Sequence, residues 1–242
     1  MSRDPRCALI TGAGRRVGAY LARSLARRGY ALHLHARTSA LGPLAFELRE
    51  EFGTPVFTHH LDLEDTVRVQ DWARDLRDTR FPPTLLVNNA SPFPSGHSVT
   101  EIEHLERGLR VHLLAPTLLL DVLSRNGGHV VNMLDARLPL TDGLRPGYEL
   151  SKHALAALTL MAAKRLAPRV RVNAIAPGLL LPPPGHDAEA LGVLARRRGP
   201  LRRPAHLEDV ASALFFLEGA ASVTGQVIHV DAGEHLGAPL YE

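Results

Sequence analysis

Residues 6–29, RCALITGAGRRVGAYLARSLARRG, place an apolar run before a glycine-rich turn and a stretch with apolar residues at helical spacing. Residues 6–10 are predicted to form a short buried strand, and Val17 and Leu21 lie on one face of the following helix. Gly29 is placed to end that helix. A strand, a glycine turn and a helix in this order can bring a dinucleotide pyrophosphate to a helix N-terminus. The motif alone is equally compatible with an ordinary tight turn.

The rest of the chain repeats this alternation, which predicts a parallel sheet with helices on both faces. The expected fold class is therefore α/β, a Rossmann-type doubly wound parallel sheet of about seven strands in a single domain over residues 1–242. Thr100 and Glu103 are predicted to form a capping box that opens a helix running to about Ser124. Residues 182–204 are rich in Pro, Gly and Arg and are predicted to be a loop. Further strands are expected at 31–35, 55–59, 84–88, 128–134, 169–175 and 226–230, and further helices at 43–53, 65–78, 148–167 and 207–218.

Composition limits the class of protein. The 242 residues are 45% hydrophobic, which is sufficient for a core, and the single cysteine, Cys7, excludes an internal disulfide and fits a reducing cytoplasm. No apolar run reaches the length of a membrane span, and no signal core begins the chain, so we expect neither a membrane nor a secretory protein. The formal charge of +3 is compatible with a phosphorylated cofactor and does not indicate a nucleic-acid partner.

The residues that follow the second predicted strand bear on the choice of cofactor. The adenosine ribose of a dinucleotide is expected at this strand end, where an acidic residue would bind a 2′-hydroxyl. The chain has no acidic residue there and has Arg37, Thr38 and Ser39 instead. A guanidinium with two hydroxyls suits a 2′-phosphate, so NADP(H) is predicted over NAD(H). The alternative is that Arg37 is one more surface arginine.

A second stretch, residues 132–152 (NMLDARLPLTDGLRPGYELSK), carries Tyr148 and Lys152 four residues apart in a predicted helix. Residues at this separation share a helix face. An ammonium beside a phenol favours the phenolate, so Lys152 is expected to lower the pKa of Tyr148 and make it a usable proton donor. Asp135 precedes the tyrosine on the same stretch. The pair alone is also compatible with a lysine that reaches water along the helix surface.

Four motifs occur in order along the chain: Thr11-Gly12-x-x-x-x-x-Gly18, Asn88-Asn89-Ala90-Ser91, Tyr148-x-x-x-Lys152 and Asn173-x-x-x-Pro177-Gly178. Together they resemble the short-chain dehydrogenase/reductase family over essentially the whole chain. The resemblance implies NAD(P)-dependent chemistry on a carbonyl or an imine and a homotetramer. It also implies that Tyr148 is the proton donor and that Lys152 binds the nicotinamide ribose and tunes Tyr148.

Two residues depart from the usual pattern of that family. Asp135 stands where most members have a serine that donates a hydrogen bond to a carbonyl oxygen. An ionised carboxylate only accepts, so it suits a substrate that presents N–H groups better than a ketone. His112 stands where most members have an asparagine of a proton relay through water. It either replaces that asparagine or packs in the helix.

A narrower resemblance, to pteridine reductases and dihydromonapterin reductases, accounts for several of these residues. The shared features are Arg16, the aromatic Phe93 after the Asn-Asn-Ala-Ser motif, Asn-Met-x-Asp at 132–135, and a histidine at position 112. In that subgroup the phenylalanine stacks on the pterin and the arginine contacts cofactor phosphate and substrate. Phe93 could alternatively pack in the core. The resemblance implies substrate contacts by Arg16, Ser91, Phe93, Asp135 and Tyr148, with Asp135, Tyr148 and Lys152 as the catalytic residues.

The same resemblance implies a larger set of cofactor contacts along the carboxyl ends of the strands. The loop over residues 179–204 is expected to lie on the substrate side. Histidines at 33, 35, 59 and 60 resemble metal ligands only superficially, so no metal is expected. The expected cofactor contacts are Gly12, Arg15, Arg16, Val17, Gly18, His35, Arg37, Thr38, Ser39, Asp62, Leu63, Asn89, Ala90, Ser91, Met133, Tyr148, Lys152, Pro177, Gly178 and Leu179.

Three functions remain open from the sequence. The first is NADPH-dependent reduction of a dihydropterin at a C=N bond. The second is reduction of a ketone, such as a 3-oxoacyl thioester, although the serine usual at position 135 is missing. The third is a non-catalytic sensor that binds NADPH, although the Tyr148 and Lys152 pair is intact.

Overall fold

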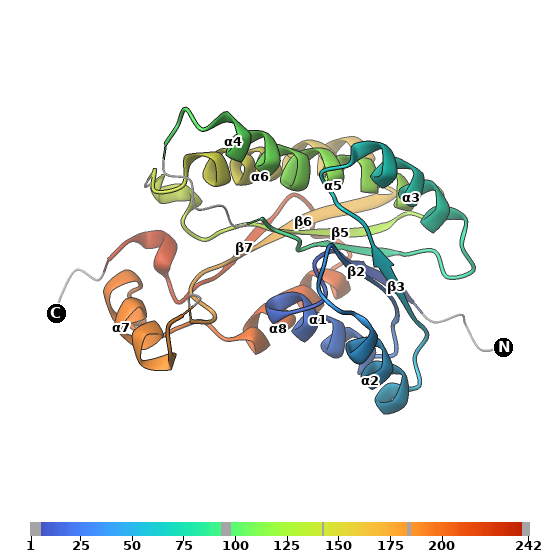
Figure 1. Ribbon diagram of the computed structural model, residues 1–242, viewed down its shortest axis with the longest axis horizontal. Coiled ribbons are helices and arrows are strands. Elements are labelled where there is room, and N and C mark those ends of the chain that lie inside the picture. The colour runs from blue at the N-terminus through green and yellow to red at the C-terminus, as the bar shows by residue number, and fades with distance from the viewer. Residues whose placement is uncertain (1–5, 93–97, 142, 183–184, 239–242) are drawn as a thin grey trace.

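The protein folds into one twisted parallel sheet between two layers of helices, as a computed structural model shows for residues 6–92, 98–141, 143–182 and 185–238 (Figure 1). The sheet has seven strands in the order β3-β2-β1-β4-β5-β6-β7, and each neighbouring pair is parallel. This confirms the predicted fold class. The strands are β1 (Cys7–Ile10), β2 (Ala31–Ala36), β3 (Val56–His60), β4 (Leu85–Asn88), β5 (Gly128–Met133), β6 (Val170–Pro177) and β7 (Val227–Val230).

The helices divide between the two faces of the sheet (Figure 1). One face carries α1, α2 and α8, and its core gathers around Leu21, Leu25 and Leu214. The other carries α3 to α6, with a core around Leu9 and Trp72. The central strands β1 and β2 are buried along their whole length, as expected for parallel strands covered on both sides. The helices are α1 (Arg16–Ala26), α2 (Gly42–Phe52), α3 (Thr66–Asp78), α4 (Ile102–Leu109), α5 (Ala115–Leu119), α6 (Pro146–Leu166), α7 (Ala188–Arg198) and α8 (Leu207–Gly219).

The strand order reverses beside β1, and this reversal fixes where a ligand can bind. From β1 the chain proceeds outward to β2 and β3 and then returns to the other side of β1 at β4. The connections after β1 and β4 therefore diverge, and the carboxyl ends of these two strands are where sheets of this topology bind ligands. The glycine turn and the Asn-Asn-Ala-Ser turn both lie there.

The segment from Thr100 to Ser124 differs from its prediction in detail. The N-cap of α4 is Glu101, whose side chain makes no capping bond, and the hydroxyl of Thr100 instead pairs with that of Ser98. The predicted capping box is therefore wrong. Between α4 and α5 the backbone widens into a π-helical turn at Arg110–Leu114, and a 3₁₀ turn at Leu120–Leu123 leads to Ser124 as predicted.

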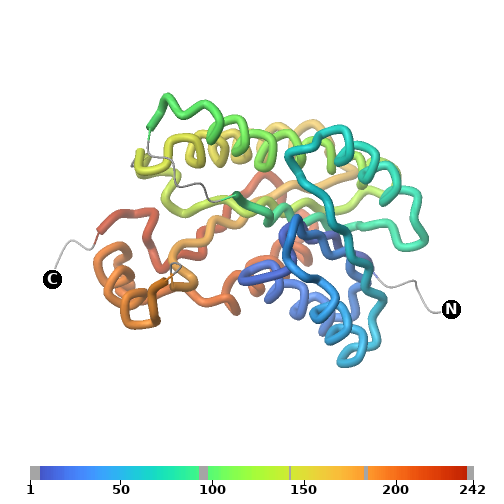
Figure 2. Tube along the Cα trace, in the orientation of Figure 1, coloured from blue at the N-terminus to red at the C-terminus, as the bar shows by residue number. Residues whose placement is uncertain are grey.

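The predicted loop over residues 182–204 is wrong in its centre, because α7 occupies Ala188–Arg198. The carboxylate of Asp187 accepts a hydrogen bond from the backbone N–H of Ala190 and caps the helix, and Glu189 lies in its first turn. The Pro residues of this segment lie outside the helix, and Gly192 lies within it without interrupting it. In Figure 2, α7 and the C-terminal segment lie together at one end of the molecule.

His33 of β2 and His59 of β3 belong to a partly buried hydrogen-bonded row. The indole N–H of Trp72 donates to His59 Nδ1 over 3.1 Å, His59 Nε2 lies 2.9 Å from His33 Nδ1, and His33 Nε2 lies 2.9 Å from the carbonyl oxygen of Phe81. Each group in this row can donate to the next, from the indole to the carbonyl, so these hydrogen bonds satisfy the ring nitrogens of His59 and His33. Within the described ranges, no group of three or more His, Cys, Asp or Glu side chains is placed to hold a metal ion.

None of the helices in the described part of the chain has the length and apolar composition needed to cross a bilayer.

The buried histidines predict that acid weakens the fold. Burial lowers the pKa of His35 and of His59 from 6.5 to about 4. Between those values the unfolded chain binds protons that the folded chain does not, so stability present above pH 6.5 is lost as the pH falls toward 4. The free energy of unfolding in urea should fall by about 2 kcal/mol between pH 7.5 and pH 5 through His35, and by less through the more exposed His59.

The variant His35→Gln provides the control, because its amide can accept and donate as the imidazole does but does not titrate. Its unfolding free energy should depend less on pH than that of the unmodified protein. Equal unfolding free energies of the unmodified protein at the two pH values would contradict the prediction.

Candidate active site

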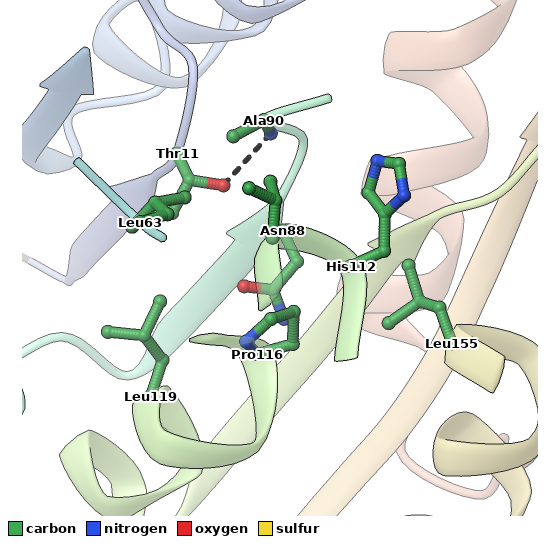
Figure 3. A pocket seen from close by; sticks show the side chains of 9 residues that line it. Thr11, Leu63, Asn88, Ala90, His112, Pro116, Leu119 and Leu155 are labelled. Carbon is green, nitrogen blue, oxygen red and sulfur yellow. Dashed lines mark hydrogen bonds between the residues drawn. The ribbon is translucent and has the colours of Figure 1, made fainter. Parts of the chain in front are cut away.

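The glycine turn after β1 and the turn after β4 are joined by Thr11. Its hydroxyl oxygen accepts the backbone N–H groups of Asn89 and Ala90, each over 3.0 Å, and Figure 3 shows the bond to Ala90. In return, the side-chain amide of Asn89 donates to the carbonyl oxygens of Thr11 and Gly12. Gly12 has a φ of 65°, and a Cβ there would lie 2.8 Å from the Cα of Ala90. Only glycine allows this conformation and this approach.

The glycine turn also touches the end of β2. The N–H of Gly12 donates to His35 Nδ1 over 3.3 Å, and His35 Nε2 lies 3.0 Å from the carbonyl oxygen of Leu61. The imidazole thus accepts at Nδ1 and donates at Nε2. A Cβ on Gly14 would lie 2.6 Å from the Cβ of Ser39. His35 and Ser39, both expected cofactor contacts, therefore lie against the glycine turn itself.

The first turn of α1 is suited to an anion. The N-cap, Arg15, makes no side-chain capping bond, and the first turn contains no acidic residue. Its backbone N–H groups and the positive end of the helix dipole are therefore not satisfied by a carboxylate of the described chain. Arg16 has a φ of 51°, a left-handed conformation that favours glycine. Such strain at a non-glycine residue is characteristic of functional sites.

Arg37 follows β2 and is half-exposed, with Thr38 and Ser39 after it. Its guanidinium lies 3.6 Å from a carboxylate oxygen of Asp62 and 3.4 Å from one of Glu64. Asp62 lies two residues after the end of β3. The carboxylates hold the guanidinium at the end of the strands, and exposed pairs of this length are weak enough to exchange for a phosphate.

A chain of buried amides positions the next part of the site. The side-chain N–H of Asn88 donates to the oxygen of Asn132 over 2.8 Å, and Asn132 donates to the hydroxyl of Thr159 over 2.9 Å. These bonds run from β4 through β5 to α6. They fix the position of α6 along the strands of the sheet, so that Tyr148 faces the residues after β5.

Tyr148 and Asp135 meet directly. The phenolic hydroxyl donates to Oδ2 of Asp135 over 2.8 Å, and Oδ1 accepts the backbone N–H of Arg137 over 2.8 Å. Lys152 is buried, and its ammonium donates to the carbonyl oxygen of Met133 over 2.6 Å. The three expected catalytic residues are thus gathered around the end of β5.

The expected effect of Lys152 on Tyr148 is wrong in this structure. Burial, and then the carboxylate of Asp135, raise the pKa of Tyr148 well above its usual value. Burial also lowers the pKa of Lys152 from 10.5 to about 8. The ammonium lies 5.8 Å from the centre of the phenol ring and bonds to Met133, whereas the carboxylate touches the hydroxyl. The nearer charge prevails because interaction energy falls with distance.

His112 lies in the π-helical turn and is fully buried. Nδ1 lies 2.8 Å from the hydroxyl of Ser151 and Nε2 lies 2.9 Å from that of Ser91. The hollow beside it, drawn in Figure 3, is lined by residues that include Thr11, Asn88 and His112 and is too narrow for a water molecule. His112 therefore contacts Ser91 of the expected site and Ser151 of α6 directly, and does more than pack in the helix.

The end of β6 is held by a buried carboxylate that the sequence did not single out. Glu234 Oε2 accepts the N–H of Leu179 over 3.1 Å, and its Oε1 lies 3.3 Å from the guanidinium groups of both Arg137 and Arg198. A Cβ on Gly178 would lie 2.7 Å from Glu234 Oε2. An isolated glutamate near the end of a chain carries no pattern, so its role depends on tertiary contacts alone.

The structure brings the other expected residues to the carboxyl ends of the strands. Phe93 lies outside the described residues, so the expected stacking position stays a prediction. The described residues of the expected site follow β1 (Gly12, Arg15, Arg16, Val17, Gly18), end or follow β2 (His35, Arg37, Thr38, Ser39), follow β3 (Asp62, Leu63) and β4 (Asn89, Ala90, Ser91), end or follow β5 (Met133, Asp135), begin α6 (Tyr148, Lys152), and end or follow β6 (Pro177, Gly178, Leu179).

Known proteins resemble the chain over nearly its whole length. A family model described as enoyl-(acyl carrier protein) reductase matches residues 12–235. FolM alternative dihydrofolate reductase 1 from Brucella canis, solved with NADP, superposes with a TM-score of 0.87 at 32% identity, over 96% of this chain and 94% of that one. Galactitol 2-dehydrogenase of Rhizobium johnstonii is 33% identical, with 95% of each chain covered. Dihydromonapterin reductase of Klebsiella pneumoniae is 28% identical, over 96% of this chain and 98% of its own.

The strained conformation of Arg16 predicts a separation of stability from activity. Arg16→Gly relieves the strain and should raise the free energy of unfolding by up to about 1 kcal/mol. It also removes a guanidinium from the site, so turnover should fall. Urea unfolding and steady-state turnover measure the two effects.

Ala232 offers a matched control, because it has a φ of 54° and carries only a methyl side chain. Ala232→Gly should also gain stability and should keep its turnover. An equal loss of turnover in both variants, or a loss of stability in Arg16→Gly, would refute the prediction.

Proposed function

The chain belongs to the short-chain dehydrogenase/reductase family, and we propose that within this family it reduces a dihydropterin with NADPH. The reaction would add a hydride to the carbon of a C=N bond and a proton to the nitrogen. The proposal names a substrate class within the oxidoreductase activity of the family.

The observation that carries this proposal is the bond between Tyr148 and the carboxylate of Asp135. A ketone reductase needs hydrogen-bond donors for the carbonyl oxygen on which negative charge develops. Here the phenolic proton points at a carboxylate, which itself only accepts. A pterin ring, which presents N–H groups along one edge, is the better match for that carboxylate.

Two relatives support the same substrate class. The Brucella canis protein is described as an alternative dihydrofolate reductase, and the Klebsiella pneumoniae protein as a dihydromonapterin reductase. Both act on reduced pteridine rings according to their names. Their similarity extends along the chain and includes the region of the candidate site.

The cofactor proposal is supported by the residues around the glycine turn. The α1 N-terminus, with no capping side chain and no acid, fits a pyrophosphate, and Arg37 with Thr38 and Ser39 fits a 2′-phosphate. NADPH, when bound, would supply the hydride. Lys152, anchored at Met133 and charged near neutral pH, would bind the nicotinamide ribose.

The raised pKa of Tyr148 shapes its proposed part in the proton transfer. A phenolate beside Asp135 is unfavourable, so Tyr148 would pass on a proton that it regains, or would orient the water that supplies one. Phe93 would stack on the pterin, and Arg16 and Ser91 would contact its polar edge. A homotetramer in the cytoplasm stays a prediction from the family and from the composition.

A second candidate is the reduction of a ketone. The 33% identical galactitol 2-dehydrogenase favours it, because a dehydrogenase of a polyol acts at a hydroxyl or carbonyl carbon. NADPH oxidation should be measured with a panel of dihydropterins, dihydrofolate, simple ketones and a 3-oxoacyl thioester. Turnover of dihydropterins supports the proposal. Turnover of ketones alone supports the second candidate, and cofactor binding without turnover of any substrate would indicate a sensor.

Replacement of the carboxylate should separate the two candidates. Asp135→Ser introduces a hydroxyl donor and should lower kcat/KM for a dihydropterin while raising that for a simple ketone. Asp135→Asn keeps the shape without the charge and should also impair dihydropterin reduction. Steady-state kinetics with both substrates give the comparison.

Tyr148→Phe is the companion variant, since it keeps the ring and removes the hydroxyl. Folding and NADPH binding should survive while turnover falls by about two orders of magnitude or more. An unchanged dihydropterin kcat/KM in Asp135→Ser would favour the ketone reductase.

The cofactor preference should depend on Arg37. The unmodified protein should bind NADPH much more tightly than NADH, because the guanidinium can exchange its exposed carboxylate partners for the phosphate. Arg37→Asp should narrow or invert the ratio of the two dissociation constants, measured by fluorescence titration. Arg74→Asp is a control, because Arg74 also pairs with a carboxylate on an exposed surface but lies on α3. Equal affinity of the unmodified protein for both cofactors would disprove the assignment.

A further inference from the structure

His112 connects the turn after β4 to α6 through two serine hydroxyls. Ser91 lies 2.9 Å from Nε2 and Ser151 lies 2.8 Å from Nδ1. The ring is about 1% exposed, and its edge-to-face contact with Tyr148 places it behind the phenol, with 5.7 Å between the ring centres. Each hydroxyl has one proton, so the direction of every bond in the row can be worked out from its end.

The end of the row is the backbone carbonyl oxygen of Tyr148, which can only accept. Ser151 donates its proton to that oxygen over 2.7 Å. Ser151 must then accept from His112, so the proton of the imidazole lies on Nδ1. Burial, and then the charge of Lys152, lower the pKa of His112 well below 6.5, so the ring is neutral and Nε2 carries a lone pair. Ser91 therefore donates to Nε2.

This direction determines what Ser91 offers to a ligand. Its single proton is engaged by His112 over 2.9 Å, and the carbonyl oxygen of Pro92, at 3.4 Å, is the more distant alternative. The Ser91 hydroxyl then presents only lone pairs to the site. Tyr148 likewise directs its proton to Asp135, so both hydroxyls and the carboxylate present acceptors.

We propose that His112 is a positioning residue that holds the Ser91 hydroxyl as a hydrogen-bond acceptor and thereby selects substrates that present an N–H group to it. This inference rests on the proposed function for its substrate class, a ring with N–H donors on its edge. It adds to that function a residue that does not touch the substrate and that acts through Ser91.

Local packing supports this arrangement. Ser151 is fully buried beside Gly108 of α4, where a Cβ would lie 2.7 Å from its hydroxyl oxygen. Gly108 thus provides the space for the hydroxyl. The π-helical turn at Arg110–Leu114 carries His112, and such turns occur frequently at functional sites. The two ring nitrogens point to opposite sides, so one rigid side chain reaches both α6 and the turn after β4.

The first test is the position of the imidazole proton, which requires no substrate. Nitrogen-15 NMR of protein labelled in its histidines, with His112→Gln used to assign the signal, should show Nδ1 protonated and Nε2 unprotonated at pH 7.5. A proton on Nε2, or on both nitrogens, would overturn the proposal.

The second test is kinetic and uses 7,8-dihydropterin with NADPH. His112→Phe keeps a buried ring without nitrogens and should raise the KM for dihydropterin about fivefold, the equivalent of one hydrogen bond, with the NADPH dissociation constant within about twofold. His112→Gln, whose amide can donate toward Ser151 and accept from Ser91, should recover most of this loss. A residue that served only packing would be restored no better by glutamine than by phenylalanine.

A double-mutant cycle tests whether His112 acts through Ser91. Ser91→Ala should raise the KM by a similar factor, and His112→Phe should add nothing in that background. Effects that multiply would overturn the proposal. Thr117→Val is the control for Ser91→Ala. It also removes a hydroxyl, on the helix that follows His112, but Thr117 donates to the backbone carbonyl of Leu113, so the KM should not change.

Failure of the proposed function can be told apart from failure of this inference. If the unmodified protein oxidises no NADPH with any dihydropterin, the substrate class is wrong, and the NMR measurement alone decides whether Ser91 is held as an acceptor. Protonation at Nδ1 would then support the inference for whichever N–H donor the substrate panel identifies.

Discussion

The hydroxyl of Thr11 is the constraint on which the site depends. It accepts two consecutive backbone N–H groups of the turn after β4 while the amide of Asn89 binds two carbonyl oxygens of the glycine turn. These bonds pair polar groups of two irregular, partly buried turns, and such a bond contributes about 1 kcal/mol to stability. The two turns are thereby locked at the reversal point of the sheet, and Ser91, immediately beyond the locked peptides, is brought to His112.

Which groups of the site donate and which accept follows from the number of protons in two rows of hydrogen bonds. One row runs from Ser91 through His112 and Ser151 to the carbonyl oxygen of Tyr148, and the phenol of the same tyrosine donates to Asp135. Tyr148 is thus held at both its backbone and its side chain. Each proton in these rows is used within the protein, and in our proposal this leaves hydrogen-bond acceptors to meet the ligand.

The sequence was informative wherever a local pattern determines the structure, and it was silent where distant residues do. Alternation of apolar runs predicted the strands, and the residues after the second strand predicted NADP(H), because both signals are contiguous. The direction of the Tyr148 pKa could not be predicted, since it depends on burial and on the distances to Asp135 and Lys152. The partners of His112 and the role of Glu234 were equally inaccessible, because each joins residues far apart in the chain.

The α7 helix shows how such a distant contact can matter for the chemistry. Composition suggested a loop, but Asp187 caps a helix whose last residue, Arg198, shares the buried carboxylate of Glu234 with Arg137. The backbone N–H of Arg137 in turn donates to Asp135. A buried carboxylate needs both its charged partners and its N–H donors, so removal of one partner leaves an unfavourable charge. The α7 helix is therefore connected through Glu234 and Arg137 to Asp135, the residue that we propose selects the substrate.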